Sequence, residues 1–114
     1  MLKRVKRRYL ALQVDSDGVP SRKEFMDAVW GAVTKLYGEY GASLTSLALI
    51  DYDSERKKAV LRTSLATLDL VRTSLATITY VANIEATVHV LSVSGTIKAL
   101  YKKLGNRKPA SQEN

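Results

Sequence analysis

The residues most able to bind a ligand lie in the stretch from Val88 to Leu104, which reads VHVLSVSGTIKALYKKL. Its first part is apolar and β-branched, as in a strand, and its last part has apolar residues at helical spacing. Between the two parts stand Ser94, Gly95 and Thr96. A hydroxyl at such a position caps a helix by accepting a hydrogen bond from a first-turn N–H group, and helix starts of this kind also bind phosphate. The pattern therefore predicts a phosphate-binding turn at the start of a helix.

Positive side chains continue along this predicted helix. Lys98, Lys102 and Lys103 fall on the face away from its apolar stripe. Such a face can extend a phosphate-binding turn, but a capped C-terminal helix that covers a core has a solvated lysine face too. The helix alone does not separate these two interpretations.

The sequence offers no other reactive group. His89 is the only histidine and there is no cysteine, so a zinc site would lack ligands. Asp51, Asp53 and Glu55 are interpreted as a solvated acidic hairpin rather than a magnesium site. No glycine-rich phosphate loop is present, and no serine has an identifiable base. We predict that this chain has no catalytic residue and binds no metal or cofactor.

The composition indicates a basic globular domain. Of 114 residues, 46% are hydrophobic and 25% are charged, which fits a single domain. Lysine and arginine total 18 against 11 acidic residues, so the net charge is +7, which indicates a polyanionic partner, nucleic acid first. The chain has no cysteine, no signal peptide and no apolar run of membrane-spanning length, so we expect a cytoplasmic protein without membrane contact.

Periodicity predicts a βαββαβα order of elements. Residues 1–8 are expected to be a basic arm, residues 9–104 a single domain, and residues 105–114 a disordered polar tail. Ser21 and Glu24 form a capping box at the start of the first helix, and Gly41 is placed to end it. The predicted strands are Tyr9–Asp15, Leu44–Tyr52, Lys57–Ser64 and Ala86–Val93, and the predicted helices are Arg22–Tyr40, Leu68–Val81 and Ile97–Leu104.

A hexapeptide, RTSLAT, occurs twice, at Arg62–Thr67 and at Arg72–Thr77. A ten-residue period matches no common solenoid, so we predict that the first copy ends a strand and the second lies inside a helix. Tertiary context would then override the local preference of six identical residues.

The element order predicts an α+β, ferredoxin-like (RRM-like) sandwich with an extra C-terminal helix. Its four-stranded antiparallel sheet would have the order 4-1-3-2, with the two main helices on one face. In that sheet the first strand begins where the third and fourth strands end. Cations from three distant segments should therefore gather at one edge as an RNA-binding surface: Arg4, Lys6, Arg7, Arg8, Arg62, Lys98, Lys102 and Lys103.

Base stacking on this sheet is not expected. RNA recognition motifs stack bases on aromatic residues of the first and third strands, but here the first strand offers only Tyr9 and the third, KKAVLRTS, offers none. The open face of the sheet would suit protein contact instead. We therefore expect RNA binding that is directed at phosphates and tolerant of sequence.

Four motifs carry a resemblance to a known family, and together they span most of Lys6 to Leu104. In chain order they are KRRYLAL (6–12), LYGEYGASL (36–44), TLDLVRTSLATI (67–78) and VSGTIKAL (93–100). With this order and spacing, the chain resembles archaeal ribonuclease P protein component 2. The tail after Leu104 has no counterpart in the resemblance.

The resemblance implies a protein subunit of ribonuclease P, the ribonucleoprotein that removes the 5′ leader from precursor tRNA. It implies that the RNA subunit carries catalysis and holds the Mg²⁺ ions, so that this chain contacts precursor tRNA only indirectly. It also implies pairing with ribonuclease P protein component 3, in a heterotetramer with two copies of each. A ribosomal or other structural RNA-binding protein, and a dimeric domain that binds a small regulatory molecule, remain the alternatives.

Overall fold

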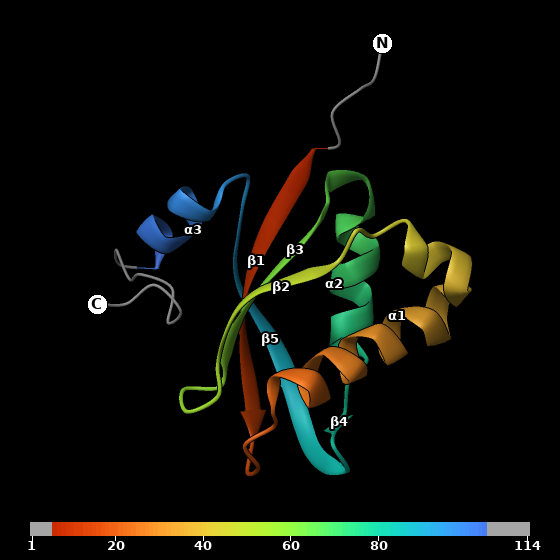
Figure 1. Cartoon of the computed structure of the whole chain (residues 1–114), viewed down its shortest axis with the longest axis vertical. Helices are drawn as coiled ribbons and strands as arrows, with labels where there is room; N and C mark the ends of the chain where they lie inside the picture. Colours follow the sequence, from red (N-terminus) through yellow and green to blue (C-terminus); the bar gives the residue numbers. More distant parts are fainter. Residues whose placement is uncertain (1–5, 105–114) are drawn as a thin grey trace.

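The computed structural model describes residues 6–104, and within them the chain forms one mixed α/β unit (Figure 1). None of the helices in this range is long and apolar enough to cross a membrane. Arg4, most of the predicted basic arm and the predicted tail lie outside the described residues. The elements are β1 (Arg7–Ser16), α1 (Arg22–Ser43), β2 (Ala48–Asp53), β3 (Lys58–Ser64), the 3-10 helix η1 (Leu65–Thr67), α2 (Leu68–Ala76), β4 (Tyr80–Val81), β5 (Ile84–Ser94) and α3 (Ile97–Lys103).

The sheet has the order β2-β3-β1-β5-β4, and each neighbouring pair is antiparallel. The four predicted strands keep their predicted order, but the prediction of four strands was wrong because β4 adds a fifth at one edge. Ala82 and Asn83 have φ values of +53° and +67°, as a tight hairpin turn requires. This turn returns the chain onto β5, where the Ala86 N–H donates to the Thr79 carbonyl over 2.9 Å.

The hairpin also shortens the second helix. The prediction carried that helix to Val81, but α2 ends at Ala76, with Thr77 as its C-cap. The two RTSLAT copies nevertheless differ as predicted. The first runs from the end of β3 into η1, and the second lies in α2 up to its C-cap. Pairing with β1 and β2 fixes the first copy as strand, whereas packing of Leu75 into the core fixes the second as helix.

Helices α1 and α2 cover one face of the sheet (Figure 1). Alternation along β1 points Leu10, Leu12 and Val14 toward them, and all three are at most 1% exposed. Apolar residues of α1 and α2 complete this main core, in particular Phe25, Val29, Val71 and Leu75.

Helix α3 lies on the opposite face (Figure 1). Leu100 is fully buried against Ala11 and Val60, and Tyr9 and Tyr101 pack around them. The face that was expected to be open for protein contact is therefore partly covered by the chain's own C-terminal helix.

Helix α1 begins as predicted and ends differently. Ser21 caps it in a capping box with Glu24, whose side chain accepts from the Ser21 N–H over 2.8 Å. The expectation that Gly41 ends the helix in a left-handed conformation was wrong. The non-helical residue is Gly38, with φ +74° and ψ 173°, and helical structure resumes after it up to Ser43. Few residues other than glycine adopt this conformation, so Gly38 permits the kink.

Candidate RNA interface

Three strand ends meet at one edge of the sheet. Within β1, Tyr9 pairs with Arg62 near the end of β3 on one side and with Ser94 at the end of β5 on the other. Arg7 pairs with Ser64, the last residue of β3. The antiparallel topology thus brings the start of β1, the end of β3 and the start of α3 together, as the predicted sheet order required. We call this end of the sheet the basic edge; its described cations are Lys6, Arg7, Arg8, Arg62, Lys98, Lys102 and Lys103.

Arg8 and the turn before α3 lie side by side. A Cβ atom built on Gly95 would stand 3.5 Å from the Nη1 atom of Arg8 and 3.8 Å from its Cζ atom. The same Nη1 atom donates to the Arg7 carbonyl over 2.8 Å. The guanidinium therefore lies against the backbone between β5 and α3, where glycine keeps the approach open. The sequence placed Arg8 and Gly95 at the same edge but gave no sign of this direct contact.

Some polar groups of the predicted phosphate-binding turn already form hydrogen bonds within the turn and the first turn of α3. The Thr96 hydroxyl accepts from the Ala99 N–H over 3.1 Å and so caps α3. Ser94 is buried, and its hydroxyl lies 3.5 Å from the Thr96 N–H. Of the two candidate caps, the threonine is the one that caps the helix. A phosphate at Ser94, Gly95 and Thr96 stays a prediction.

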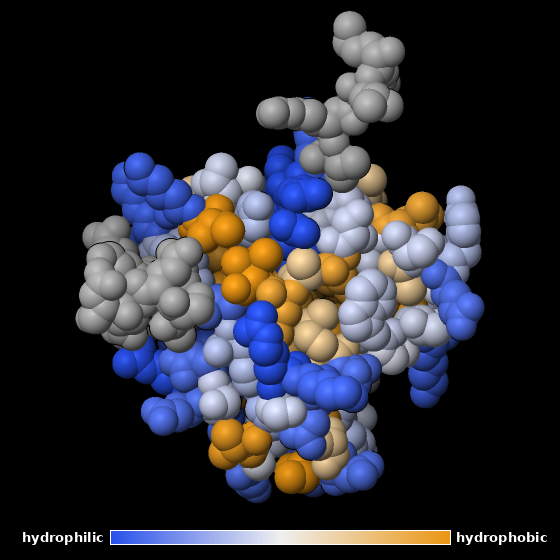
Figure 2. Space-filling view, viewed as in Figure 1, coloured by the Kyte–Doolittle hydropathy of each residue, from blue (hydrophilic) through white to orange (hydrophobic). Residues whose placement is uncertain are grey.

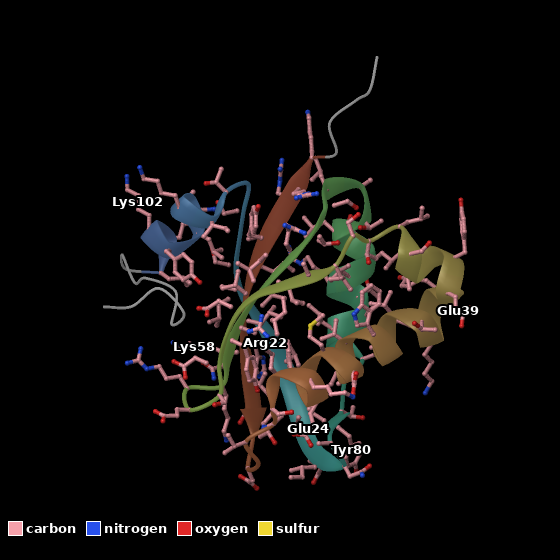
Figure 3. The ribbon with its side chains drawn as sticks, in the orientation of Figure 1. Arg22, Glu24, Glu39, Lys58, Tyr80 and Lys102 are labelled. Atoms are coloured by element: carbon pink, nitrogen blue, oxygen red, sulfur yellow. The ribbon has the colours of Figure 1, made fainter. Side chains whose placement is uncertain are left out.

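The three lysines of α3 are exposed but not equivalent. The Lys103 Nζ atom donates to the Val93 carbonyl over 2.8 Å, which ties the end of α3 to β5. Lys98 and Lys102 make no hydrogen bond or ion pair with the described residues, and Lys102 extends from α3 into solvent (Figure 3). Lys98 and Lys102 are therefore the freer anion-binding groups.

The remaining predicted cations also differ from one another. Lys6 is exposed, while its carbonyl accepts from the Leu65 N–H over 2.7 Å. Arg7 and Arg8 belong to β1 rather than to an arm, because the strand begins at Arg7. Arg62 is half-buried, and its Nε atom has no hydrogen-bond partner among residues 6–104. Arg62, like Arg8, is thus only partly accessible, whereas Lys6 and Arg7 are exposed.

Charge is distributed unevenly along the sheet. The ion pairs among residues 6–104 are Lys23–Asp27 at 2.9 Å and Arg56–Asp53 at 3.8 Å, and neither involves the basic edge. Carboxylates collect at the other end of the strands: Asp15, Asp17, Asp53, Glu55 and Glu85. The cations of the basic edge are therefore left to attract an external polyanion.

One carboxylate lies beneath α3. Asp51 is buried on β2, and its Oδ2 atom accepts from the Tyr101 hydroxyl over 3.2 Å. Burial, followed by the nearby Asp51 charge and this hydrogen bond, raises the pKa of the Tyr101 phenol. The pair holds α3 on the sheet and keeps the tyrosine neutral.

The described residues do not assemble an active site. No group of three or more His, Cys, Asp and Glu side chains within residues 6–104 could hold a metal ion. Asp53 instead accepts from the Glu55 and Arg56 N–H groups, each over 3.1 Å, and so shapes the hairpin loop. His89 is exposed on β5. A groove of about 420 Å³ between α1 and residues 77–80 contains Lys35 and Tyr80 but no nucleophile paired with a base.

The sheet also lacks a platform for base stacking. Tyr9, the one aromatic residue of β1, is half-buried in the cluster beneath α3, and β3 carries no aromatic residue. Hydrophilic surface instead extends over the start of β1 and over α3 (Figure 2). The geometry suits phosphate contacts better than base readout.

Comparison with known proteins identifies the family of this chain. A family model described as the Rpp14/Pop5 family matches residues 8–105. The chain belongs to the Rpp14/Pop5 family. Ribonuclease P protein component 2 of Pyrococcus furiosus is 32% identical over 100 residues, covering 88% of this chain and 83% of that protein. The protein of the same name from Methanothermobacter thermautotrophicus is 30% identical over 106 residues, covering 88% and 86%.

A solved structure has the same fold despite low sequence identity. A chain in the cryo-EM structure of yeast ribonuclease MRP superposes with a TM-score of 0.69, covers 93% of each chain and is 16% identical. The fold of this chain is thus shared with a protein of the yeast ribonuclease MRP structure.

Proposed function

We propose that this chain is a non-catalytic, RNA-binding protein subunit of ribonuclease P that supports the RNA subunit in removing the 5′ leader from precursor tRNA. The observation that carries the proposal is membership of the Rpp14/Pop5 family over residues 8–105, together with archaeal relatives named ribonuclease P protein component 2. The basic edge gives this role a physical basis, because its cations can neutralise RNA phosphates.

The partners follow from the same proposal. The chain would contact ribonuclease P RNA directly and pair with ribonuclease P protein component 3, two copies of each forming a heterotetramer in the cytoplasm. Magnesium would be held by the RNA. We also assign the fold to the ferredoxin-like arrangement, extended by β4 and α3.

The experiment is to capture RNA with the tagged chain from cells and to sequence it. Enrichment of ribonuclease P RNA supports the proposal, whereas ribosomal RNA would favour a ribosomal protein, and no RNA would favour a domain that binds small molecules.

A reconstitution completes the test. The protein alone should not cleave precursor tRNA, but with its RNA and component 3 it should increase cleavage at low Mg²⁺, because neutralised phosphates let the RNA fold with fewer ions. Cleavage by the RNA-free protein, abolished by a point change in it, would contradict the proposal.

A further inference from the structure

The two copies of RTSLAT use their hydroxyl groups differently. In the second copy the bonds stay within one helix: Ser74 donates to the Leu70 carbonyl over 2.9 Å, and Thr77 donates to the Ser74 carbonyl over 2.7 Å. Bonds of this kind are local and fix nothing outside α2. The hydroxyls of the first copy instead bond to one another and to another segment of the chain. The first copy therefore has a connecting role that the second copy lacks.

Three hydroxyls of the first copy are linked in series. Ser64 Oγ lies 2.5 Å from Thr67 Oγ1, and Thr67 Oγ1 lies 3.1 Å from Thr63 Oγ1. The Thr63 hydroxyl donates to the Thr45 carbonyl over 2.8 Å. Each hydroxyl has one hydrogen, so along the shortest contacts Ser64 donates to Thr67 and Thr67 donates to Thr63. We call the hydroxyls of Thr63, Ser64 and Thr67 the hydroxyl network.

This network is buried, and it does not serve to cap a helix. Its three residues and Thr45 are each at most 9% exposed, so water does not compete for these bonds. Thr67 stands at the N-cap of α2, a position where a threonine hydroxyl commonly accepts from a first-turn N–H group. Here its side chain makes no capping bond. The Thr67 hydroxyl is thus used between segments of the chain rather than for its own helix.

The network holds the end of β3 to the loop that follows α1. The Ser64 N–H also donates to the Thr45 carbonyl, over 2.9 Å. The Thr45 hydroxyl in turn donates to the Ala42 carbonyl in α1 over 2.7 Å. The end of β3 is therefore held by bonds that the strand ladder does not supply.

The same stretch of backbone carries cations of the basic edge. In the ladder between β1 and β3, Arg7 pairs with Ser64 and Arg8 pairs with Thr63. The Lys6 carbonyl accepts from the N–H of the residue after Ser64 over 2.7 Å. Residues directly opposite in antiparallel strands share one face of the sheet, so the buried Thr63 is the immediate neighbour of Arg8. The position of three cations therefore depends on where the end of β3 lies (Figure 1).

A closed end of β3 matters for binding. Strand ends with few neighbours open locally at little cost in free energy. A buried hydroxyl network opposes this opening, because its members polarise one another and a broken bond leaves a buried polar group unpaired. Cations on a fixed backbone also lose less conformational entropy on binding than cations on a mobile one. The network can therefore raise RNA affinity without touching RNA.

We propose that the hydroxyl network of the first RTSLAT copy consists of positioning residues for RNA binding, because it fixes the backbone from which Lys6, Arg7 and Arg8 reach phosphates. The inference rests on the proposed function, which supplies ribonuclease P RNA as the probe. It assigns the repeated hexapeptide a role in RNA binding in its first copy and none in its second.

The duplication supplies a matched control. Filter binding of ribonuclease P RNA across a salt series is measured for the unmodified chain, for Thr67→Val and for Thr77→Val, the same substitution at the same place in the second copy. Valine keeps the shape of threonine, removes the hydroxyl and leaves the net charge unchanged. Because no charge is lost, a change in the slope of log affinity against log salt reports displaced cations, which lower stability of a still folded protein does not produce.

The expected effect is the loss of about one phosphate contact in Thr67→Val. The slope should then fall in magnitude by about 0.7–0.9, and if that contribution vanishes near 1 M salt, affinity at about 0.1 M salt should fall roughly 5- to 8-fold. Thr77→Val should leave the slope unchanged and alter affinity less than about 2-fold. Thr67→Ser, which keeps the hydroxyl and drops the methyl group, should restore both quantities.

Thermal melting shows whether each variant is folded at the temperature of the binding measurement. Should Thr67→Val fail to fold, Ser64→Ala removes the first hydroxyl of the network, and Ser74→Ala is its matched control in the second copy. Ser64→Ala should lower the slope in the same direction, and Ser74→Ala should not.

The remaining outcomes separate this inference from the proposed function. An unchanged slope in folded Thr67→Val, or equal losses in Thr67→Val and Thr77→Val, would overturn the positioning role and leave the proposed function intact. Binding by Thr67→Ser as weak as by Thr67→Val would assign the effect to packing of the methyl group and overturn the role of the hydroxyl. Failure of the unmodified chain to bind ribonuclease P RNA would overturn the proposed function itself and this inference with it.

Discussion

Lys98 and Lys102 allow the sharpest test of the basic edge, because they are its exposed cations on α3 without a hydrogen bond or ion pair to the described residues. Lys103 is a poorer choice, since its ammonium group holds the Val93 carbonyl and its loss would also loosen α3. Alanine at positions 98 and 102 removes two charges and keeps good helix formers on the helix. The perturbation is the double variant Lys98→Ala/Lys102→Ala.

The expected effect follows from counterion release. If each lysine contacts one phosphate, the slope of log affinity against log salt should fall in magnitude by roughly 1.4–1.8, the sum of two contacts of about 0.7–0.9 each. If that contribution vanishes near 1 M salt, the loss of affinity at about 0.1 M salt is roughly 25- to 60-fold. Filter binding of ribonuclease P RNA across a salt series measures both quantities.

The control must carry the same charge change at another place. Lys57 is unsuitable because its ammonium group donates to the Ser16 carbonyl and its φ is +57°. Lys35 and Lys58 are exposed, make no ion pair within residues 6–104 and lie away from the basic edge, so Lys35→Ala/Lys58→Ala is the matched control. Equal losses in the two double variants would mean that only net charge matters, and the basic edge would not be a site. Loss confined to the control would refute the placement of the RNA altogether.

Three further predictions concern the fold. Leu75 is 1% exposed, so Leu75→Ala should lower the free energy of unfolding by about 2–5 kcal/mol, whereas Arg72→Ala at an exposed position should lower it little. An unchanged denaturation midpoint for Leu75→Ala would contradict the core assignment. Gly38→Ala should destabilise the fold by about 1–3 kcal/mol, because φ +74° with ψ 173° strains any residue with a Cβ atom. Gly31 has open space around it, so Gly31→Ala should be neutral or stabilising by up to about 1 kcal/mol. Chemical denaturation measures both changes. The folded-state pKa of Tyr101 lies above its unfolded value of 10.0, so the stability that the neutral phenol contributes is complete below pH 10.0 and is lost as the pH rises above it. In alkaline thermal melts, Tyr101→Phe should therefore lose less stability than the unmodified chain. An identical alkaline loss in the two proteins would show that the Tyr101–Asp51 contact does not act in solution.

Local pattern was sufficient for most elements of this fold. Alternation of Leu10, Leu12 and Val14 predicted β1 and its buried face, since side chains in a strand alternate between its two faces. The Ser21–Glu24 pair predicted the start of α1, because a capping box satisfies backbone donors within one turn. The order of the four main strands followed from element order, because few chain paths connect such elements without crossing.

Two features of the helices could not be predicted from the local pattern. Ile78 and Val81 fit a continuing helix, but α2 ends at Ala76, and the pairing of Tyr80 and Val81 with Glu85 and Ile84 of β5 makes β4 the better structure there. Gly38 and Gly41 are three residues apart, and either could have ended α1. A Cβ atom on Gly41 would stand 2.8 Å from the Cβ atom of Tyr37, so Gly41 belongs to a close contact while Gly38 takes the kink.

The charge of this chain and the position of its cations near the strand ends can be read from the sequence, because composition and strand order follow from residue types along the chain. Which of those cations are free to bind depends on long-range packing. On the face of the sheet that α3 covers, Tyr9 and Arg62 are half-buried. There Lys103 also bonds to β5, and Arg8 lies against Gly95. These contacts join residues as many as 87 positions apart, as between Arg8 and Gly95, and such a distance is closed by the pairing of β1 with β5 and the packing of Leu100 on Ala11 and Val60 rather than by any local preference of the chain.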